Sequence, residues 1–387
     1  MAFQDQFSYY GPTRLFMGRG SIGNIPELLA EQGLKKALIV TDQGLVDAGL
    51  VGHITALLDL ANIAHSTFSN VAPNPPIKNV TDCTAQYQTE GCDHLIAIGG
   101  GSSMDVAKTT GVLVNNGGKI SDYFIGTGGP VKKRIPYLLC VATTYGTASE
   151  VTPFAVVTDE NNYKAAVAGA HIIPDVGILD ADMAVGLPRP IAAATGMDAL
   201  THAIESYVSL ASNPISEGMA LHAIRLIAQN LRQAAFSDCN HEATQNMLVA
   251  STMAGFAFSQ TRLGNVHAMS HPVSGHYGVP HGVANAILLT RVMDFNRYAC
   301  PEKFAEIAVA MGEDITGLGD VDAAMLSVES VENLSGDVGI PSSLSEAGAK
   351  AEGIPMLAED TMKSGNVAVN PRKTTIQDVI ALYEEAM

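Results

Sequence analysis

The chain has 387 residues, of which 47% are hydrophobic and 16% charged, and its formal net charge is −17. A single hydrophobic core stops growing near about 250–300 residues, so two domains are expected. An acidic chain repels phosphate backbones and anionic lipid surfaces, which argues against a nucleic acid or a membrane as the main partner. No apolar run approaches the roughly 20 residues that span a bilayer.

The five cysteines are odd in number and show no C-x-x-C spacing. Neither a disulfide framework nor a zinc site built on thiolates is therefore expected, and a reducing compartment fits the composition. Residues 1–12 contain no basic segment and no apolar run of the kind that directs export. We therefore expect a soluble, cytoplasmic protein.

Short apolar runs alternate with helical patterns in the first half of the chain, and each run ends at a turn. This arrangement indicates a parallel sheet that is buried on both faces. A pair of alternating segments around Asn161–Asn162 instead predicts a β-hairpin. The predicted sheet strands are 37–41, 94–98, 135–141 and 176–179, and the predicted hairpin strands are 154–158 and 164–168.

From Ile191 onward the periodicity is helical and no segment predicts a strand. Pro188 and Pro190 mark the change, so we place the domain boundary near residue 187. The sequence thus predicts an α/β domain over 1–187 and an all-helical domain over 188–387. Helices are expected over 216–236, 243–258, 283–298 and 375–387.

A glycine-rich loop, Gly99–Gly101, lies between a predicted strand and a predicted helix. Three glycines let the backbone approach a bulky ligand, and a helix N-terminus offers free N–H groups to a pyrophosphate. The loop does not have the G-x-G-x-x-G pattern. The alternative is a tight turn in which Ser102 and Asp105 form a capping box.

Two other strand ends carry polar side chains. Asp42 follows the first predicted strand, where a carboxylate can hydrogen-bond an adenosine ribose and favour NAD over NADP. The alternative for Asp42 is an ordinary helix N-cap. Hydroxyl groups and a glycine follow the third predicted strand, at Thr143–Ser149. Open α/β sheets bind ligands at such strand ends, so a nucleotide site is expected here.

The helical domain holds a cluster of possible metal ligands. Asp198 and His202 are four residues apart, so both project from one helix face, and His267 and His271 repeat this spacing. His281 follows a proline in the same short window. Imidazole and carboxylate donors suit Fe(II) or catalytic Zn(II), and the spacing leaves both open.

Four segments carry a family resemblance: GGGSSMDVAK (99–108), TTYGTASEVT (143–152), ATGMDALTHAIESY (194–207) and LGNVHAMSHPVSGHYGVPHGVANAILL (263–289). They resemble the iron-dependent (group III) alcohol dehydrogenase family, and within it the lactaldehyde:propanediol oxidoreductase and 1,3-propanediol dehydrogenase groups. The resemblance covers nearly the whole chain. It implies a Rossmann-like dinucleotide-binding domain followed by a helical metal-binding domain, as in the dehydroquinate synthase-like fold. It also implies a homo-oligomer, either a dimer or a larger ring.

The resemblance assigns roles residue by residue. The metal ligands match Asp198, His202, His267 and His281, whereas His271 matches a histidine near the nicotinamide that is not a ligand. The NAD(H) contacts match Asp42, Asn74, Gly100, Gly101, Ser102, Thr143, Thr144, Thr147 and Lys164. Phe258 is our candidate for an apolar substrate wall, with plain helix packing as the alternative.

Several positions depart from the family pattern. Ser103-Met104 stands where Pro-His or Pro-Gln is common, and Tyr145 stands where alanine is common. Thr152–Phe154 replaces a segment that tends to carry a polar residue near the substrate, which makes Phe154 a second substrate-wall candidate. His276 has no standard counterpart. These departures concern the substrate rather than the metal or the cofactor.

We expect hydride transfer between a small alcohol or aldehyde and a nicotinamide, with the substrate oxygen polarised by the metal and His271 relaying a proton. One alternative is a zinc-dependent polyol oxidoreductase of the glycerol dehydrogenase type, or a lyase of the dehydroquinate synthase type. A non-redox metallohydrolase is an alternative from a different class.

Overall fold

The computed structural model describes residues 9–160 and 164–387, and the chain divides into two compact units. The α/β unit comprises Gly11–Thr144 and Ala148–Val185. The helical unit comprises Gly186–Met387 with Tyr145–Thr147 and the described residues before Gly11. The α/β class of the first domain and the helical class of the second are confirmed, whereas the boundary at residue 187 stays a prediction.

The α/β unit is built on a six-stranded sheet of order β1-β8-β5-β4-β2-β3, in which every pair is parallel. The four predicted sheet strands form its four central strands. The outer strands β1 and β3 were not predicted. The strands are β1 (Arg14–Met17), β2 (Lys36–Val40), β3 (Ala64–Phe68), β4 (His94–Gly99), β5 (Leu138–Ala142) and β8 (Val176–Leu179).

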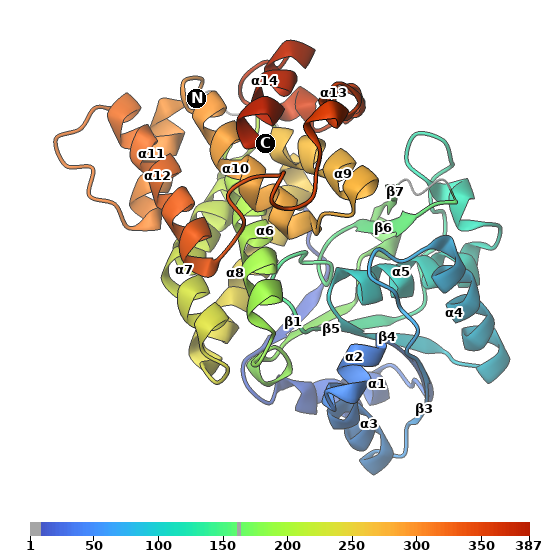
Figure 1. Ribbon diagram of the computed structural model, residues 1–387. Helices are drawn as coiled ribbons and strands as arrows, with labels where there is room; N and C mark the ends of the chain where they lie inside the picture. The colour runs from blue at the N-terminus through green and yellow to red at the C-terminus, as the bar shows by residue number, and fades with distance from the viewer. Residues whose placement is uncertain (1–8, 161–163) are drawn as a thin grey trace. The chain divides into compact units, whose positions relative to one another are not determined.

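Helices cover both faces of this sheet (Figure 1). On one face α1 (Ile25–Glu31) and α3 (Leu50–Leu60) bury their apolar side chains against β2, β4, β5 and β8. On the other face lie α4 (Ile77–Glu90) and α5 (Gly101–Asn116). Burial on both faces explains why the central strands are continuous apolar runs.

The strand order reverses between β2 and β4. From β2 the chain runs outward to the edge strand β3, and it then returns to β4 on the other side of β2. In open α/β sheets, ligands bind beyond the carboxyl ends of the strands at such a point. Asp42 follows β2 and Gly100 follows β4, so the topology places both residues at this edge.

The predicted hairpin is also confirmed. Strands β6 (Phe154–Thr158) and β7 (Lys164–Ala168) pair antiparallel, with Phe154 opposite Ala168 and Thr158 opposite Lys164. The predicted turn at Asn161–Asn162 lies outside the described residues.

Buried polar side chains tie α5 to this hairpin. The Lys108 ammonium is fully buried and donates to Ser149 Oγ (2.8 Å), to Thr152 O and to Phe154 O (2.8 Å). The Asp105 carboxylate accepts from Ser149 Oγ and from the Val156 N–H. Burial raises the pKa of Asp105 and lowers that of Lys108, and each charge partly offsets the effect on the other. The capping-box interpretation of Asp105 is therefore wrong.

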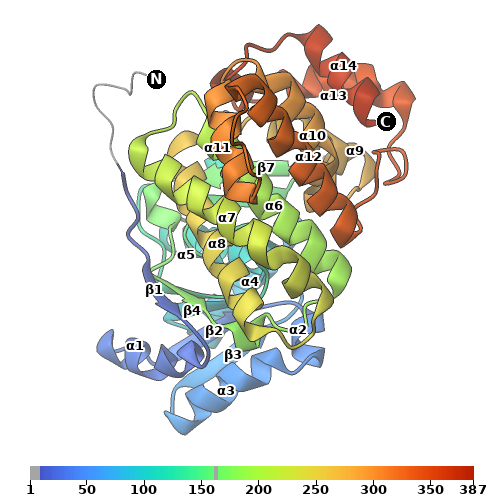
Figure 2. The same cartoon turned by 90° about the vertical axis from the view of Figure 1, so that its left-hand side faces the viewer.

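The helical unit contains α6–α14, and no strand occurs in it among the residues that the structure describes. Helices α6, α7 and α8 pack side by side (Figure 2). The helices are α6 (Arg189–Val208), α7 (Pro214–Phe236), α8 (His241–Thr261), α9 (Asn265–Tyr277), α10 (His281–Arg297), α11 (Pro301–Met311), α12 (Asp320–Val338), α13 (Ile354–Thr361) and α14 (Ile376–Ala386). Across the described ranges, no helix is long and apolar enough to cross a membrane.

Replacing Lys108 with methionine should destabilise the protein, because the substitution leaves the Asp105 carboxylate buried without its cation. Breaking a buried charge pair costs about 3–5 kcal/mol, and urea unfolding followed by circular dichroism measures this change. Lys132→Met is the control: Lys132 is exposed, so its loss should change stability by about 0.5 kcal/mol or less. Equal stabilities of the two variants would contradict the proposed importance of the pair.

Candidate active site

Three of the predicted metal ligands converge in the helical unit. Asp198 on α6, His267 on α9 and His281 on α10 each offer one donor atom, and these atoms lie within 4.8 Å of one another. Asp198 Oδ1 lies 3.6 Å from His267 Nε2 and 3.8 Å from His281 Nε2. The fourth predicted ligand joins them, since His202 Nε2 also lies 3.8 Å from Asp198 Oδ1. One carboxylate oxygen thus faces three imidazole nitrogens.

The local sequence explains this convergence. Asp198 and His202 share one face of α6 because they are four residues apart. His281 is the first residue of α10, directly after the N-cap Pro280. A glycine then lets the backbones of α10 and α6 approach closely. A Cβ on Gly282 would lie 2.2 Å from the Ala194 carbonyl oxygen, so glycine at this position brings the start of α10 against α6.

Glu205, which the sequence analysis missed, orients His267. Its carboxylate accepts from His267 Nδ1 (2.6 Å) and from the Val266 N–H (2.6 Å). A proton held on Nδ1 leaves Nε2 directed at Asp198, which is how a metal-binding imidazole is commonly fixed. The available signal was its spacing, because Glu205 lies three residues after His202 on the same helix.

His202 is held from two sides. Its Nδ1 lies 3.2 Å from the Gly146 carbonyl oxygen, and its ring stacks on Phe258 with centroids 4.5 Å apart. Gly146 can lie this close to α6 because it has no side chain. A Cβ at this position would lie 2.9 Å from Thr195 Cβ. Phe258 is only 7% exposed, which agrees with the helix-packing alternative. Its ring also borders the ligand cluster, and its role as a substrate wall stays a prediction.

The charges of the cluster are strongly coupled. Burial acts to raise the pKa of Asp198, but the surrounding histidines outweigh it and the pKa falls below its usual range. Burial, aided by His267, lowers the pKa of His202 to about 4. Burial opposes protonation of His267 as well, yet Glu205 and Asp198 raise its pKa to about 9. At neutral pH Asp198 is therefore ionised and His202 neutral, the forms in which both groups bind metals, whereas His267 carries a proton that a bound ion would displace.

His271 lies beside the ligand cluster but outside it. Its exposed ring stacks on that of His281, with centroids 5.2 Å apart, and meets the His267 ring edge-on at 6.0 Å. His276, further along α9, instead pairs with Asp360 at 2.8 Å. Of the two histidines, His271 lies beside the cluster, and its proton-relay role stays a prediction.

Most of the predicted cofactor residues lie in the α/β unit, at the carboxyl edge of the sheet. A Cβ on Gly100 would lie 3.0 Å from Thr144 Oγ1, so the loop after β4 runs directly against the segment after β5. Gly100 is the N-cap of α5 and has no side chain to satisfy the first N–H groups of that helix. Glycine backbone at a helix N-terminus fits a pyrophosphate. Gly101, Ser102 and Thr143 are part of this same edge.

Asp42 serves as the N-cap of α2 (Gln43–Asp47). Its Oδ1 accepts the Leu45 N–H at 3.1 Å. The N-cap alternative for Asp42 is therefore confirmed. The cap uses one carboxylate oxygen, and the ribose role of Asp42 stays a prediction.

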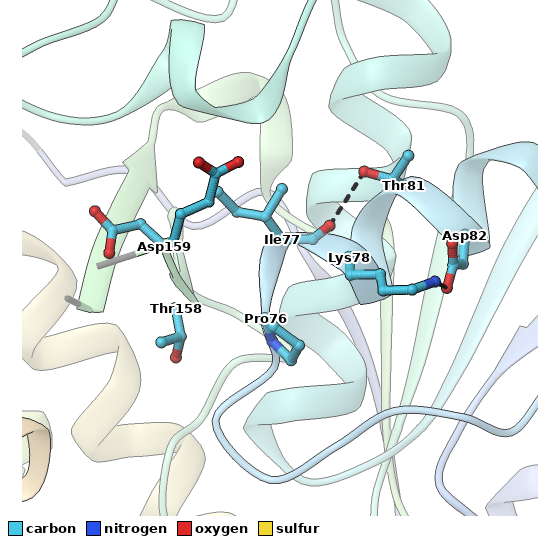
Figure 3. Close-up of a pocket in the computed structure, with 8 residues that line it drawn as sticks. Pro76, Ile77, Lys78, Thr81, Asp82, Thr158 and Asp159 are labelled. Carbon is cyan, nitrogen blue, oxygen red and sulfur yellow. Dashed lines mark hydrogen bonds and ion pairs between the residues drawn. The ribbon is translucent and has the colours of Figure 1, made fainter. Parts of the chain in front are cut away.

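Asn74 and Lys164 are linked by Thr158. The Thr158 hydroxyl donates to the Asn74 carbonyl oxygen (3.1 Å), and Thr158 lies opposite Lys164 in the hairpin. A hollow of about 350 Å³ adjoins Thr158 (Figure 3). It is lined by Pro76, Ile77, Lys78, Thr81, Asp82, Thr158, Asp159 and Glu160. Lys78 faces Asp82 there at 2.5 Å, so its charge is already paired.

Two predicted residues stand apart from these groups. Thr147 belongs to the helical unit, unlike the other predicted cofactor residues. Phe154 is half-buried in β6 of the α/β unit, where its carbonyl accepts from Lys108. Its substrate role stays a prediction.

Two family models match the chain. Residues 12–181 match the model described as iron-containing alcohol dehydrogenase, and residues 192–387 match the C-terminal model of the Fe-containing alcohol dehydrogenase family. The chain belongs to the iron-containing alcohol dehydrogenase family. It is therefore an oxidoreductase, and the metallohydrolase alternative is wrong.

Full-length relatives agree with this assignment. The chain is 43% identical over 384 residues to a 1,3-propanediol dehydrogenase of Klebsiella pneumoniae, with 98% of each protein covered. It is 40% identical over 372 residues to a lactaldehyde reductase of Escherichia coli, covering 96% of this chain and 97% of the relative. A crystal structure of a 1,3-propanediol oxidoreductase superposes with a TM-score of 0.95 at 42% identity, covering 99% of this chain and all of the other.

A more distant relative has been solved with a cofactor. The sulfoacetaldehyde reductase of Bifidobacterium kashiwanohense, in complex with NAD+, superposes with a TM-score of 0.90 at 30% identity, with 99% of each chain covered. The resemblance drawn from the four motifs is thus confirmed at the level of the family.

Gly282→Ala should destabilise the protein by about 1–3 kcal/mol, because its Cβ would collide with the Ala194 carbonyl and push α10 from α6. Gly218→Ala is a matched control with the opposite sign. Gly218 lies exposed within α7, and a Cβ added there would have nothing within 4 Å, so alanine should stabilise the helix by about 0.5–1 kcal/mol. Thermal unfolding of both variants measures the difference, and a neutral Gly282→Ala would contradict the close approach.

Proposed function

We propose that this protein is an iron-dependent, NAD(H)-linked alcohol dehydrogenase and aldehyde reductase that acts on short-chain alcohols, diols or small aldehydes. The observation that carries the proposal is the convergence of Asp198, His267 and His281 within 4.8 Å. The substrate class rests on the 1,3-propanediol dehydrogenase and lactaldehyde reductase relatives.

Asp198, His202, His267 and His281 would hold the metal. Their one oxygen and three nitrogen donors suit Fe(II) and also Zn(II), and the family favours iron. When bound, the metal supplies Lewis-acid chemistry and the nicotinamide supplies hydride chemistry. Glu205 holds a proton of His267 on Nδ1, so that Nε2 would be the nitrogen that releases its proton and binds the ion.

The cofactor would lie at the carboxyl edge of the sheet. The absence of a side chain at Gly100 and the uncapped start of α5 support a pyrophosphate site there. Asp42 would bind the adenosine ribose through the oxygen that does not cap α2. The full proposed set is Asp42, Asn74, Gly100, Gly101, Ser102, Thr143, Thr144, Thr147 and Lys164.

His271 would carry the proton between the substrate oxygen and solvent, since its exposed ring lies against His281. Phe258 would form an apolar wall beside His202 and exclude water from that side. Phe154 is proposed as a second apolar side chain near the substrate.

The remaining proposals concern the whole chain. Residues 1–187 would bind the cofactor and residues 188–387 the metal. We also propose a cytoplasmic homo-oligomer, a dimer or a larger ring. The five cysteines support a reducing compartment, because all are free and four of them are buried.

Chelation should abolish NADH-dependent reduction of short aldehydes, and Fe(II) should restore it better than Zn(II). His267→Ala should lose bound metal together with activity, because it removes a ligand at the centre of the cluster. His276→Ala is the control on the same helix and should keep both. Metal content by mass spectrometry and NADH absorbance measure the two properties. Full activity of the metal-free protein would refute the proposal.

Asp42→Asn should relax the preference for NADH over NADPH by about fivefold or more, because two charges about 4 Å apart repel by about 1 kcal/mol even in water. Asparagine also caps helices, so α2 should be retained. Asp47→Asn, at the other end of α2, is the control. The ratio of kcat/KM for the two cofactors measures the change, and an unaltered ratio would count against the ribose role.

A further inference from the structure

Asn285 places its side-chain amide inside the ligand cluster. It lies on α10, four residues after His281, and is 0% exposed. Its Nδ2 lies 2.6 Å from Asp198 Oδ1 and 3.1 Å from Nε2 of both His267 and His281. One amide nitrogen therefore contacts a donor atom of three proposed ligands.

The neighbours of Asn285 fix the orientation of this amide. Its Oδ1 is buried and has no hydrogen-bond partner in the described part of the chain. Turning the amide over would bring this oxygen against the Asp198 carboxylate, and two acceptors would then face each other without a proton. The contacts of the nitrogen alone hold the side chain, and the shortest of them is the bond to Asp198.

Asp198 Oδ1 can accept this bond and still bind an ion. A carboxylate oxygen has two lone pairs, whereas each histidine Nε2 has one. A cation would take the histidine lone pairs and one lone pair of Asp198, so the N–H···Oδ1 bond is the one contact of Asn285 that the metal leaves in place.

We propose that Asn285 is a positioning residue of the metal centre, whose amide fixes the Asp198 oxygen around which the three histidines gather. The inference rests on the metal site proposed above. It predicts that the N–H groups of Asn285, and not merely its volume, contribute to metal affinity.

The chain offers a matched comparison on the same helix. Asn296 is also buried on α10 and also hydrogen-bonded, but its partner is Asn370 (3.0 Å) rather than a proposed ligand. Leucine resembles asparagine in branching and size and has no N–H group. Asn285→Leu and Asn296→Leu therefore both remove a buried amide, and only the first removes one that faces the cluster.

The test is titration of the metal-free full-length protein with Co(II), followed by calorimetry and by the visible absorption of the bound ion. Asn285→Leu should bind Co(II) about 10–100-fold more weakly than the unaltered protein, as is common when a group that orients a ligand is lost. Its Co(II) absorption bands should also shift. Asn296→Leu should keep both the affinity and the spectrum. Where Asn285→Leu does not fold, Asn285→Ala replaces it in the same titration.

The outcomes separate the two proposals. If the unaltered protein binds one Co(II) per chain and His267→Ala does not, the metal site stands. Unchanged affinity and spectrum in Asn285→Leu would then overturn the role of Asn285 alone. A similar loss of affinity in Asn296→Leu would overturn it too, because the effect would belong to helix packing. Binding that His267→Ala leaves unchanged would overturn the metal site itself.

Discussion

The arrangement of the helical unit depends on one buried charge. The Asp198 carboxylate is 4% exposed, and an ionised carboxylate in that position is unfavourable unless groups of opposite polarity surround it. The protonated His267, whose Nε2 lies 3.6 Å from Asp198 Oδ1, and the Asn285 amide nitrogen at 2.6 Å do so. Asp198 lies on α6 and these groups lie on α9 and α10, so the compensation of one charge requires three helices to meet. Glycine at 282 lets α10 come close enough to α6.

In the α/β unit, backbone groups would compensate the negative charge of a bound cofactor. A chain with net charge −17 has few cations for an anionic cofactor, and Lys108, which lies in the helix after the glycine loop, is fully committed to oxygens of its own unit. The free N–H groups at the start of α5 carry no formal charge and need no lysine. The overall acidity is therefore compatible with the proposed binding of a single dinucleotide at one edge of a sheet.

The sequence predicted the features that one short segment reveals by itself, and it missed those that depend on contacts between distant segments. The central strands were predicted because burial on both faces makes them continuously apolar, whereas the edge strand β1 is partly exposed and mixed in character. The histidine cluster was visible as spacing. Asp105 was misread as a cap because its true partners, Ser149 and Val156, lie more than 40 residues away. Asn285 and Glu205 were missed because they are recognised by what they touch, although both lie on the same helix as a predicted ligand.

Helix α6 shows why these missed residues belong with the site. It is buried from Gly196 to Val208, and a helix buried all round is ordinarily apolar. Here that stretch carries Asp198, Thr201, His202, Glu205 and Ser206, each bonded within the helical unit. Replacing buried charged groups by well-packed apolar residues of similar volume is often neutral or stabilising. These polar residues of α6 are therefore better explained by the chemistry of the site than by folding, and the same reasoning extends to Asn285, whose amide nitrogen donates to Asp198.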